Sequence, residues 1–247
     1  MSAIITDQIR ILNAKNFVAG ISSSSNSYYS WIGLPNPTDL QTDWDNNPPA
    51  PKDSFNDENE YWDSMLALKK ITAADARQVV TRRAWTSGTV YDMYRSDYTR
   101  TNTAKVSGAT NLYQASYYVI NADYRVYICL QNGTTPETPN GKSSLDEPTF
   151  IDLEPRAAGT SGDGYIWKYL YTIKPSDIVK FDSADFIPLP SDWANNTDVS
   201  DVRNNAVDGK IETVIIEDVG SANYQFTGTK NNVPIKGDGS GALASVT

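Results

Sequence analysis

The sequence predicts an α+β fold that is predominantly antiparallel β with a few short helices, followed by a small C-terminal glycine-rich β module. Segments rich in Tyr, Val and Ile alternate with segments rich in Gly, Pro, Asn and Asp, which is typical of strands joined by turns. Helical spacing of apolar residues occurs only in the first third of the chain. The 247 residues are enough to bury a sizeable core, and we expect two domains, 1–208 and 209–247.

The N-terminal segment predicts one helix and one strand. The helix should start at Thr6 or Asp7, which can cap it, and end near Gly20. A short strand is expected over 28–32, where Tyr and Trp side chains gather. The proline- and aspartate-rich segment 35–60 has no apolar period and predicts a long surface loop.

Two more helices are expected before the β-rich part. Asn56 or Asp57 can cap the first, and apolar residues then recur at spacings of three and four as far as Lys69. Thr72 and Asp75 form a capping box for a third, short helix. Beyond Val90 the pattern changes to strand.

The segment 116–133 predicts a hairpin, with its turn at 121–123 between two aromatic and β-branched stretches. In the second strand of this hairpin four side chains should share one face: Tyr124, Val126, Ile128 and Leu130. Residues 132–164 predict a long loop.

The most regular strand pattern lies in Ser161–Pro175, SGDGYIWKYLYTIKP. Rings occupy every second position, so one face of the strand should be aromatic and buried. The preceding Gly-Asp-Gly predicts a sharp turn, and Pro175 should end the strand. Together with Trp85, these rings are the expected structural core: Tyr165, Trp167, Tyr169 and Tyr171.

Composition excludes several classes of site. The formal net charge of −9 argues against binding to nucleic acid or to an anionic membrane. The chain has no histidine, so triads that contain histidine are excluded, along with most zinc sites. Cys129 is the only cysteine and lies in an apolar run, which predicts a buried, unreactive thiol. The N-terminus lacks the features of a signal peptide, and no segment has the length and apolarity of a membrane span.

No catalytic motif is complete. Asn140–Ser143 matches the end of a phosphate-binding loop, but Pro136 stands where the first glycine should be. The acids between Asp39 and Asp63 match no calcium-loop spacing and predict a solvated loop. A pair of glycosidase carboxylates can lie anywhere in a sequence, so carbohydrate binding or cleavage stays open as an alternative. We therefore expect no catalytic residue, no cofactor, no metal and no small-molecule substrate.

The segment 209–247 differs from what precedes it. KIETVIIED alternates apolar and polar residues, and a Gly-Asp-Gly-Ser-Gly turn at 237–241 leads into a last predicted strand, LASV. Because this strand ends with the sequence, we expect the natural chain to continue.

Five stretches taken in order resemble the gene-eight family of baseplate wedge subunits from contractile-tailed, T4-like bacteriophages. They cover roughly 28–193: YYSWIGLPNP, VVTRRAW, YYVINADYRVYICLQNG, SGDGYIWKYLYTIKP and FIPLPSDW. The most specific pieces are the Arg-Arg-x-Trp of Arg82, Arg83 and Trp85, the G-D-G-Y-x-W of 162–167, and the exit to Trp193.

The resemblance implies a structural virion protein of the tail baseplate, made in the host cytoplasm. It implies that the chain pairs with itself as a homodimer and packs against other wedge subunits, with rearrangement when the tail contracts. The candidate partner-interface residues are Trp31, Trp44, Arg82, Arg83 and Trp193. The alternative is a carbohydrate-binding or carbohydrate-cleaving tail protein, which would need exposed rings beside carboxylates.

Overall fold

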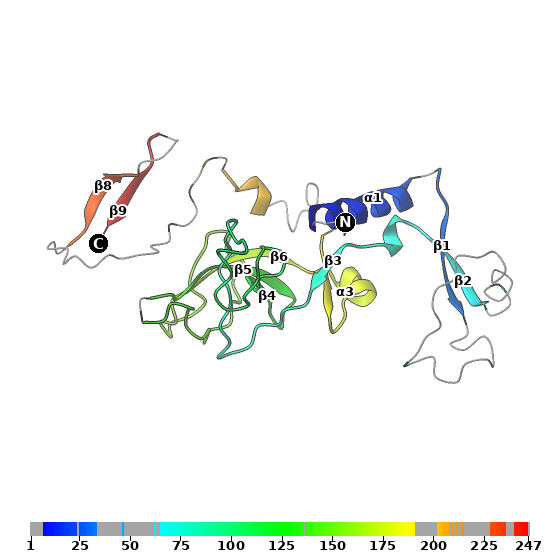
Figure 1. Ribbon diagram of the computed structural model, residues 1–247, viewed down its shortest axis with the longest axis horizontal. Helices are drawn as coiled ribbons and strands as arrows, with labels where there is room; N and C mark the ends of the chain where they lie inside the picture. The colour runs from blue at the N-terminus through cyan, green and yellow to red at the C-terminus, as the bar shows by residue number, and fades with distance from the viewer. Residues whose placement is uncertain are drawn as a thin grey trace. The chain divides into compact units, whose positions relative to one another are not determined.

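A three-stranded antiparallel sheet carries most of the core (Figure 1). Its order is β4-β5-β6, with β4 at Tyr118–Ile120, β5 at Arg125–Asn132 and β6 at Tyr165–Thr172. The expected hairpin is confirmed, because β4 and β5 pair directly across a short turn. Asn121 shapes this turn by accepting hydrogen bonds from the backbone N–H groups of Asp123 at 3.0 Å and Arg125 at 2.9 Å.

The structure is a computed structural model. It describes residues 7–23, 25–33, 46, 62, 65–135, 137–190, 202–207, 209, 211, 214, 228–235 and 240–246. The chain divides into two compact units, Met1–Thr213 and Val214–Thr247. The fold class is confirmed as α+β, since all four sheets of the described residues are antiparallel and the helices are few.

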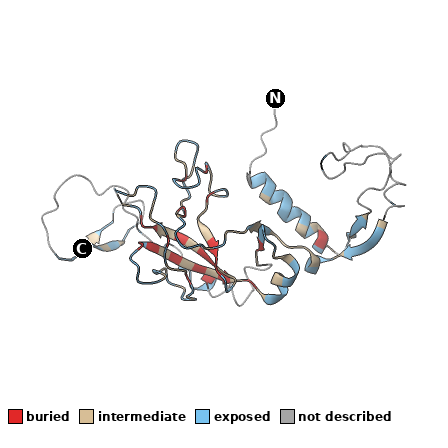
Figure 2. Ribbon diagram, turned by 90° about the horizontal axis from the view of Figure 1, so that it is seen from below, coloured by how far each residue is buried: buried red, intermediate tan, exposed pale blue. Residues whose placement is uncertain are grey.

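Strand β6 buries every second residue, as its sequence predicts (Figure 2). The Gly-Asp-Gly turn before it also forms as expected. Gly162 and Gly164 have φ of +73° and +82°, values that glycine adopts without steric cost, and the Asp163 carboxylate accepts a hydrogen bond from the Tyr165 N–H at 3.0 Å. At Gly164 any Cβ would lie 2.7 Å from the Cα of Gly133, so the two loops approach too closely for a side chain.

Strand β5 departs from its expected face. Register shifts lie between Val126 and Tyr127 and again between Cys129 and Gln131, so the buried face changes along the strand. Val126 is buried as predicted, but after it Tyr127 and Cys129 are the fully buried residues. Ile128 and Leu130 are only half-buried, so the prediction of one continuous face from 124 to 130 is wrong.

A two-stranded sheet joins distant parts of the chain. β3 (Val79–Thr81) pairs with β7 (Phe186–Pro188), and α3 (Pro175–Phe181) precedes β7. β6 ends at Thr172, three residues before Pro175, and Pro175 occupies the first turn of α3, where its missing N–H costs nothing. The sequence pattern around Pro175 predicts the end of a strand but not this helix.

The strands expected directly after Val90 do not form; the described residues 91–117 contain none. Buried Asp92 organises this segment instead, since its carboxylate accepts hydrogen bonds from three backbone N–H groups. The donors are Val106 at 2.9 Å, Ser107 at 3.3 Å and Ser116 at 2.9 Å. These bonds satisfy the backbone locally, so no strand ladder is required.

The N-terminal helix and strand are confirmed as α1 (Asp7–Ser22) and β1 (Tyr28–Gly33). The helix expected over 57–69 is wrong for its second half, because β2 (Met65–Ile71) is a strand paired antiparallel with β1. The apolar run of Met65–Ile71 is too short to form a stable helix before the Thr72 capping box. Pairing with β1 provides hydrogen-bond partners for its backbone N–H and C=O groups. Where the third helix is expected, the structure has only the 3-10 turn η2 (Ala73–Asp75), after which β3 begins.

In the second unit, β8 (Lys230–Pro234) pairs antiparallel with β9 (Leu243–Val246), the position of the last predicted strand. Most of KIETVIIED and the residues 236–239 lie outside the described part of the chain. The unit boundary falls close to the domain boundary that we expect from the sequence, which stays a prediction.

Candidate functional site

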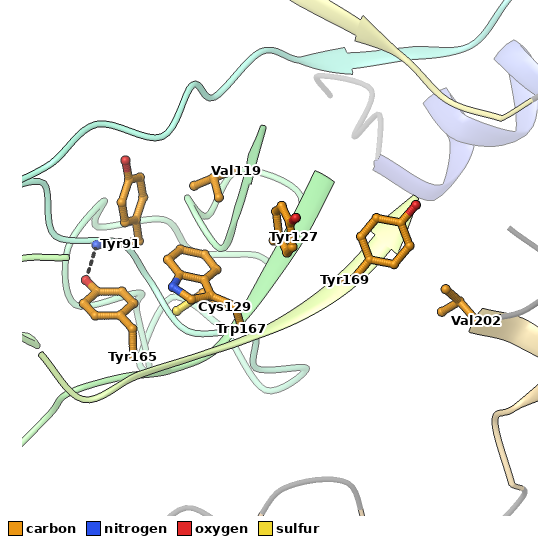
Figure 3. Packing of buried hydrophobic residues seen from close by; sticks show 8 residues of the cluster. All are labelled: Tyr91, Val119, Tyr127, Cys129, Tyr165, Trp167, Tyr169 and Val202. Atoms are coloured by element: carbon orange, nitrogen blue, oxygen red, sulfur yellow. Dashed lines mark hydrogen bonds between the residues drawn. The ribbon is translucent and has the colours of Figure 1, made fainter. Parts of the chain in front are cut away.

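The aromatic face of β6 is buried in the interior of the fold (Figure 3). Its four rings expose between 0% and 7% of their surface: Tyr165, Trp167, Tyr169 and Tyr171. Trp167 stacks on Tyr165 with ring centres 5.3 Å apart and meets Tyr91 edge-on at 5.7 Å. A ring face buried in this way is closed to a sugar or a base.

Several polar atoms of this cluster are used internally, although the buried Trp167 Nε1 has no hydrogen-bond partner among the described residues. The Tyr165 hydroxyl donates to the Lys142 carbonyl at 2.8 Å and accepts from the Tyr91 N–H at 3.0 Å. Trp85 packs against the same cluster and donates from Nε1 to the Ser144 hydroxyl at 3.0 Å. Burial raises the pKa of Tyr127 to about 12, so its hydroxyl stays neutral near pH 7.

Cys129 is wholly buried within the cluster, and its thiol is free. Burial raises the pKa of this thiol well above its ordinary value, which disfavours the thiolate that reacts as a nucleophile.

Arg82 and Arg83 bind within the chain. The Arg82 guanidinium forms an ion pair with Asp182, just beyond α3, and lies over the ring of Tyr124. Arg83 donates to the Ser116 hydroxyl at 2.8 Å and to the Gln114 carbonyl at 3.1 Å. The two arginines therefore bridge segments of this fold, and a role in contacts with a partner stays a prediction.

Trp44 and Trp193 lie outside the described residues. Trp31 lies on β1 and is 43% exposed, opposite Leu68 of β2. It belongs to a part of the chain that we call the N-terminal arm and define as α1, β1 and β2.

The N-terminal arm has no hydrophobic core of its own. None of the three buried clusters of the described residues includes a side chain from it, and Ile21 is its single buried apolar residue among those described (Figure 2). Eight large apolar side chains of the arm are exposed instead: Ile9, Leu12, Phe17, Tyr29, Trp31, Ile32, Leu66 and Leu68.

Local contacts join the helix to the strands. The rings of Phe17 and Tyr28 meet edge-on with centres 5.7 Å apart, and the Asn26 side chain donates to the Gly20 carbonyl at 3.1 Å. The register places Trp31 beside Leu68 on one face of the ribbon and Ile32 beside Ala67 on the other. Both faces therefore expose apolar side chains.

Covering the exposed side chains of this arm would remove apolar surface from water. A two-stranded ribbon is marginal in water without a third strand or a packed helix, and a continuous exposed apolar patch marks an interaction surface. The sequence predicts Trp31 as an interface residue but not its neighbours Leu66 and Leu68, because their spacing also fits a helix. The shortness of the run Met65–Ile71 was the available signal for a strand.

The described residues contain neither a metal-binding group nor a phosphate-binding loop. No group of three or more acidic or cysteine side chains there could hold a metal ion. No helix begins directly after Lys142, since residues 142–174 contain none, so the segment lacks the strand-loop-helix arrangement of a phosphate-binding loop. Within the same residues no helix has the length and apolarity to cross a membrane.

Comparison with known proteins defines the class of protein to which the chain belongs. A sequence model of the family described as "Bacteriophage T4, Gp8" matches residues 3–152, more than half of the chain. The protein belongs to this Gp8 family, as the five stretches of sequence predict. The match includes Arg82, Arg83 and Trp85 but ends before the G-D-G-Y-x-W of β6.

A relative extends the similarity. The chain is 25% identical over 219 residues to "Baseplate wedge protein gp8" of Enterobacteria phage T4. The alignment covers 76% of this chain and 60% of the relative, so the chain spans three fifths of the length of the curated relative that it matches.

Proposed function

We propose that the protein is a structural subunit of a phage tail baseplate wedge, acting through protein–protein assembly. Membership of the Gp8 family carries this proposal, because the matched relative is a baseplate wedge protein. The N-terminal arm supports it independently, since an arm without a core suits a subunit that is completed by its neighbours.

The proposal includes neither catalysis nor a cofactor. The chain has no histidine, and the rings that could stack on a sugar are buried in the core. The protein is made in the host cytoplasm, ends in the tail baseplate and contacts itself and other wedge subunits. Carbohydrate binding or cleavage is the alternative from another class, and turnover of a polysaccharide that is abolished by replacing one carboxylate would establish it.

Two measurements test the proposal, one on assembled tails and one on the isolated protein. Gold labelling of an affinity tag on this chain should mark the baseplate end of purified phage tails, and light scattering of the isolated protein at micromolar concentration should give the mass of a dimer. Tails without label would contradict the baseplate function. A monomer at every concentration would contradict self-association alone.

A further inference from the structure

The outer edge of β1 belongs to a strand without charge. Strand β1 has the sequence YYSWIG and is the longest strand of the described residues that has no charged side chain. It pairs with β2 along one edge, and no backbone hydrogen bond links its other edge to another described segment. Native proteins usually protect such an edge with lysine or proline, because an unprotected edge pairs readily with another strand.

The opposite edge of the ribbon is protected. Strand β2 carries Lys69 and Lys70, and both lysines are exposed. If two copies of the chain met along β2, these lysines would come close to those of the other copy, and like charges across a strand pair are unfavourable. Charge therefore disfavours self-pairing through β2 and leaves β1 as the edge that can pair.

Strand β1 can pair antiparallel with a second copy of itself. A two-fold axis between the two copies of Ser30 places Tyr29 opposite Trp31 of the second copy, and Tyr28 opposite Ile32. This register uses residues 28–32, where the pairing of β1 with β2 is also regular. Two aromatic residues, or an aromatic and a β-branched residue, stabilise a sheet when they lie opposite each other. No charged residue is opposed.

Such pairing would convert two ribbons into one four-stranded sheet of order β2-β1-β1-β2. A two-stranded ribbon is marginal in water, whereas three or more strands with an apolar face can be stable. The two copies of β2 would lie three strand spacings apart, or about 14 Å. This exceeds the Debye length of about 8 Å at physiological salt, so the repulsion between their lysines is largely screened.

We propose that β1 pairs with β1 of a second copy of this chain, antiparallel about Ser30, to form this sheet. The inference rests on the proposed function, which includes self-association, and adds the surface through which self-association occurs. A second copy is the occupant because a symmetric dimer needs a surface that is complementary to itself, and β1 meets this condition without opposing charges. Pairing through edges leaves both faces of the sheet open to other subunits.

Cysteine cross-linking of the isolated full chain tests the inference. Ser30 is exposed, and in the proposed register its two copies lie directly opposite, with Cα atoms about 4.5 to 5.5 Å apart. This spacing suits a disulfide bond. Ser30→Cys should therefore give a covalent dimer on oxidation with copper phenanthroline, which a non-reducing gel detects.

Ala67→Cys is the matched control for cross-linking. Ala67 is exposed on β2, opposite Ile32, and its two copies would lie about 14 Å apart, too far for a disulfide. The native thiol of Cys129 is present in both variants and is buried, so it should contribute equally little to both.

A charge at position 30 tests the register independently. Ser30 lies opposite Lys69 within the ribbon, so Ser30→Glu adds an opposite-charge pair inside one copy but places two carboxylates side by side between copies. The Kd of the dimer, measured by light scattering over a dilution series, should rise at least about tenfold. Ser30→Thr should leave the Kd nearly unchanged, and thermal melting checks that both variants are folded.

Three outcomes would overturn the inference while leaving self-association intact: a dimer whose Ser30→Cys variant forms no disulfide, equal cross-linking at positions 30 and 67, or a Ser30→Glu dimer as tight as the wild type. A monomer at every concentration would instead remove self-association, and the inference would fall with it.

Discussion

Replacing Trp167 by alanine is expected to lower the free energy of unfolding by about 3 to 5 kcal/mol. The indole is fully buried and contacts the rings of Tyr91 and Tyr165, so its removal leaves a cavity in the largest core cluster. A loss of this size is a large part of the roughly 5 to 15 kcal/mol that stabilises a typical domain. Denaturant unfolding followed by circular dichroism measures it.

Trp62→Ala is the matched control, since it deletes the same side chain where 65% of the residue is exposed. Substitution at an exposed position usually changes stability by no more than about 0.5 kcal/mol. Equal stability of the Trp167 variant and the wild type would show that the aromatic face of β6 is not the core of this fold.

Replacing Asp92 by asparagine is expected to lower the free energy of unfolding by about 2 to 4 kcal/mol. Two backbone N–H groups, of Val106 and Ser107, point at one carboxylate oxygen, and that of Ser116 points at the other. An amide has only one acceptor oxygen, so at least one of these part-buried hydrogen bonds is lost and its backbone N–H faces another donor. Hydrogen exchange at the Val106 and Ser116 amides should accelerate.

Asp152→Asn is the control for this change. Asp152 is exposed and pairs with exposed Arg156, four residues later in a loop, and such a surface ion pair is worth only a few tenths of a kcal/mol. If Asp92→Asn leaves both stability and amide exchange unchanged, the carboxylate does not organise residues 91–117.

Period-two alternation made β6 predictable, because both the ring positions and the ends of the strand are marked in the sequence. The face of β5 was less predictable, since its two register shifts depend on how β6 pairs with it and not on local pattern. Residues 91–117 look like strand by composition, but a single buried carboxylate provides another way to satisfy the backbone. The local sequence pattern does not show that the Asp92 carboxylate will bind these backbone N–H groups.

The N-terminal arm illustrates a second limit. Met65, Leu66 and Lys69 fit helical spacing as well as they fit a short strand, and pairing with Tyr28–Gly33 decides between them. That pairing joins residues more than thirty positions apart. The exposed apolar surface around Trp31 follows from the pairing, so only a fragment of the candidate site was visible in the sequence.

Hydroxyl-radical footprinting of the free protein and of assembled tails tests most directly whether assembly completes the arm. Tyr29, Trp31, Leu66 and Leu68 are exposed in the isolated chain and should oxidise readily there, whereas Trp167 should be protected in both states. In assembled tails we predict strong protection of these four arm residues, because neighbouring subunits cover them. Equal oxidation of the arm in the free protein and in tails would contradict the account.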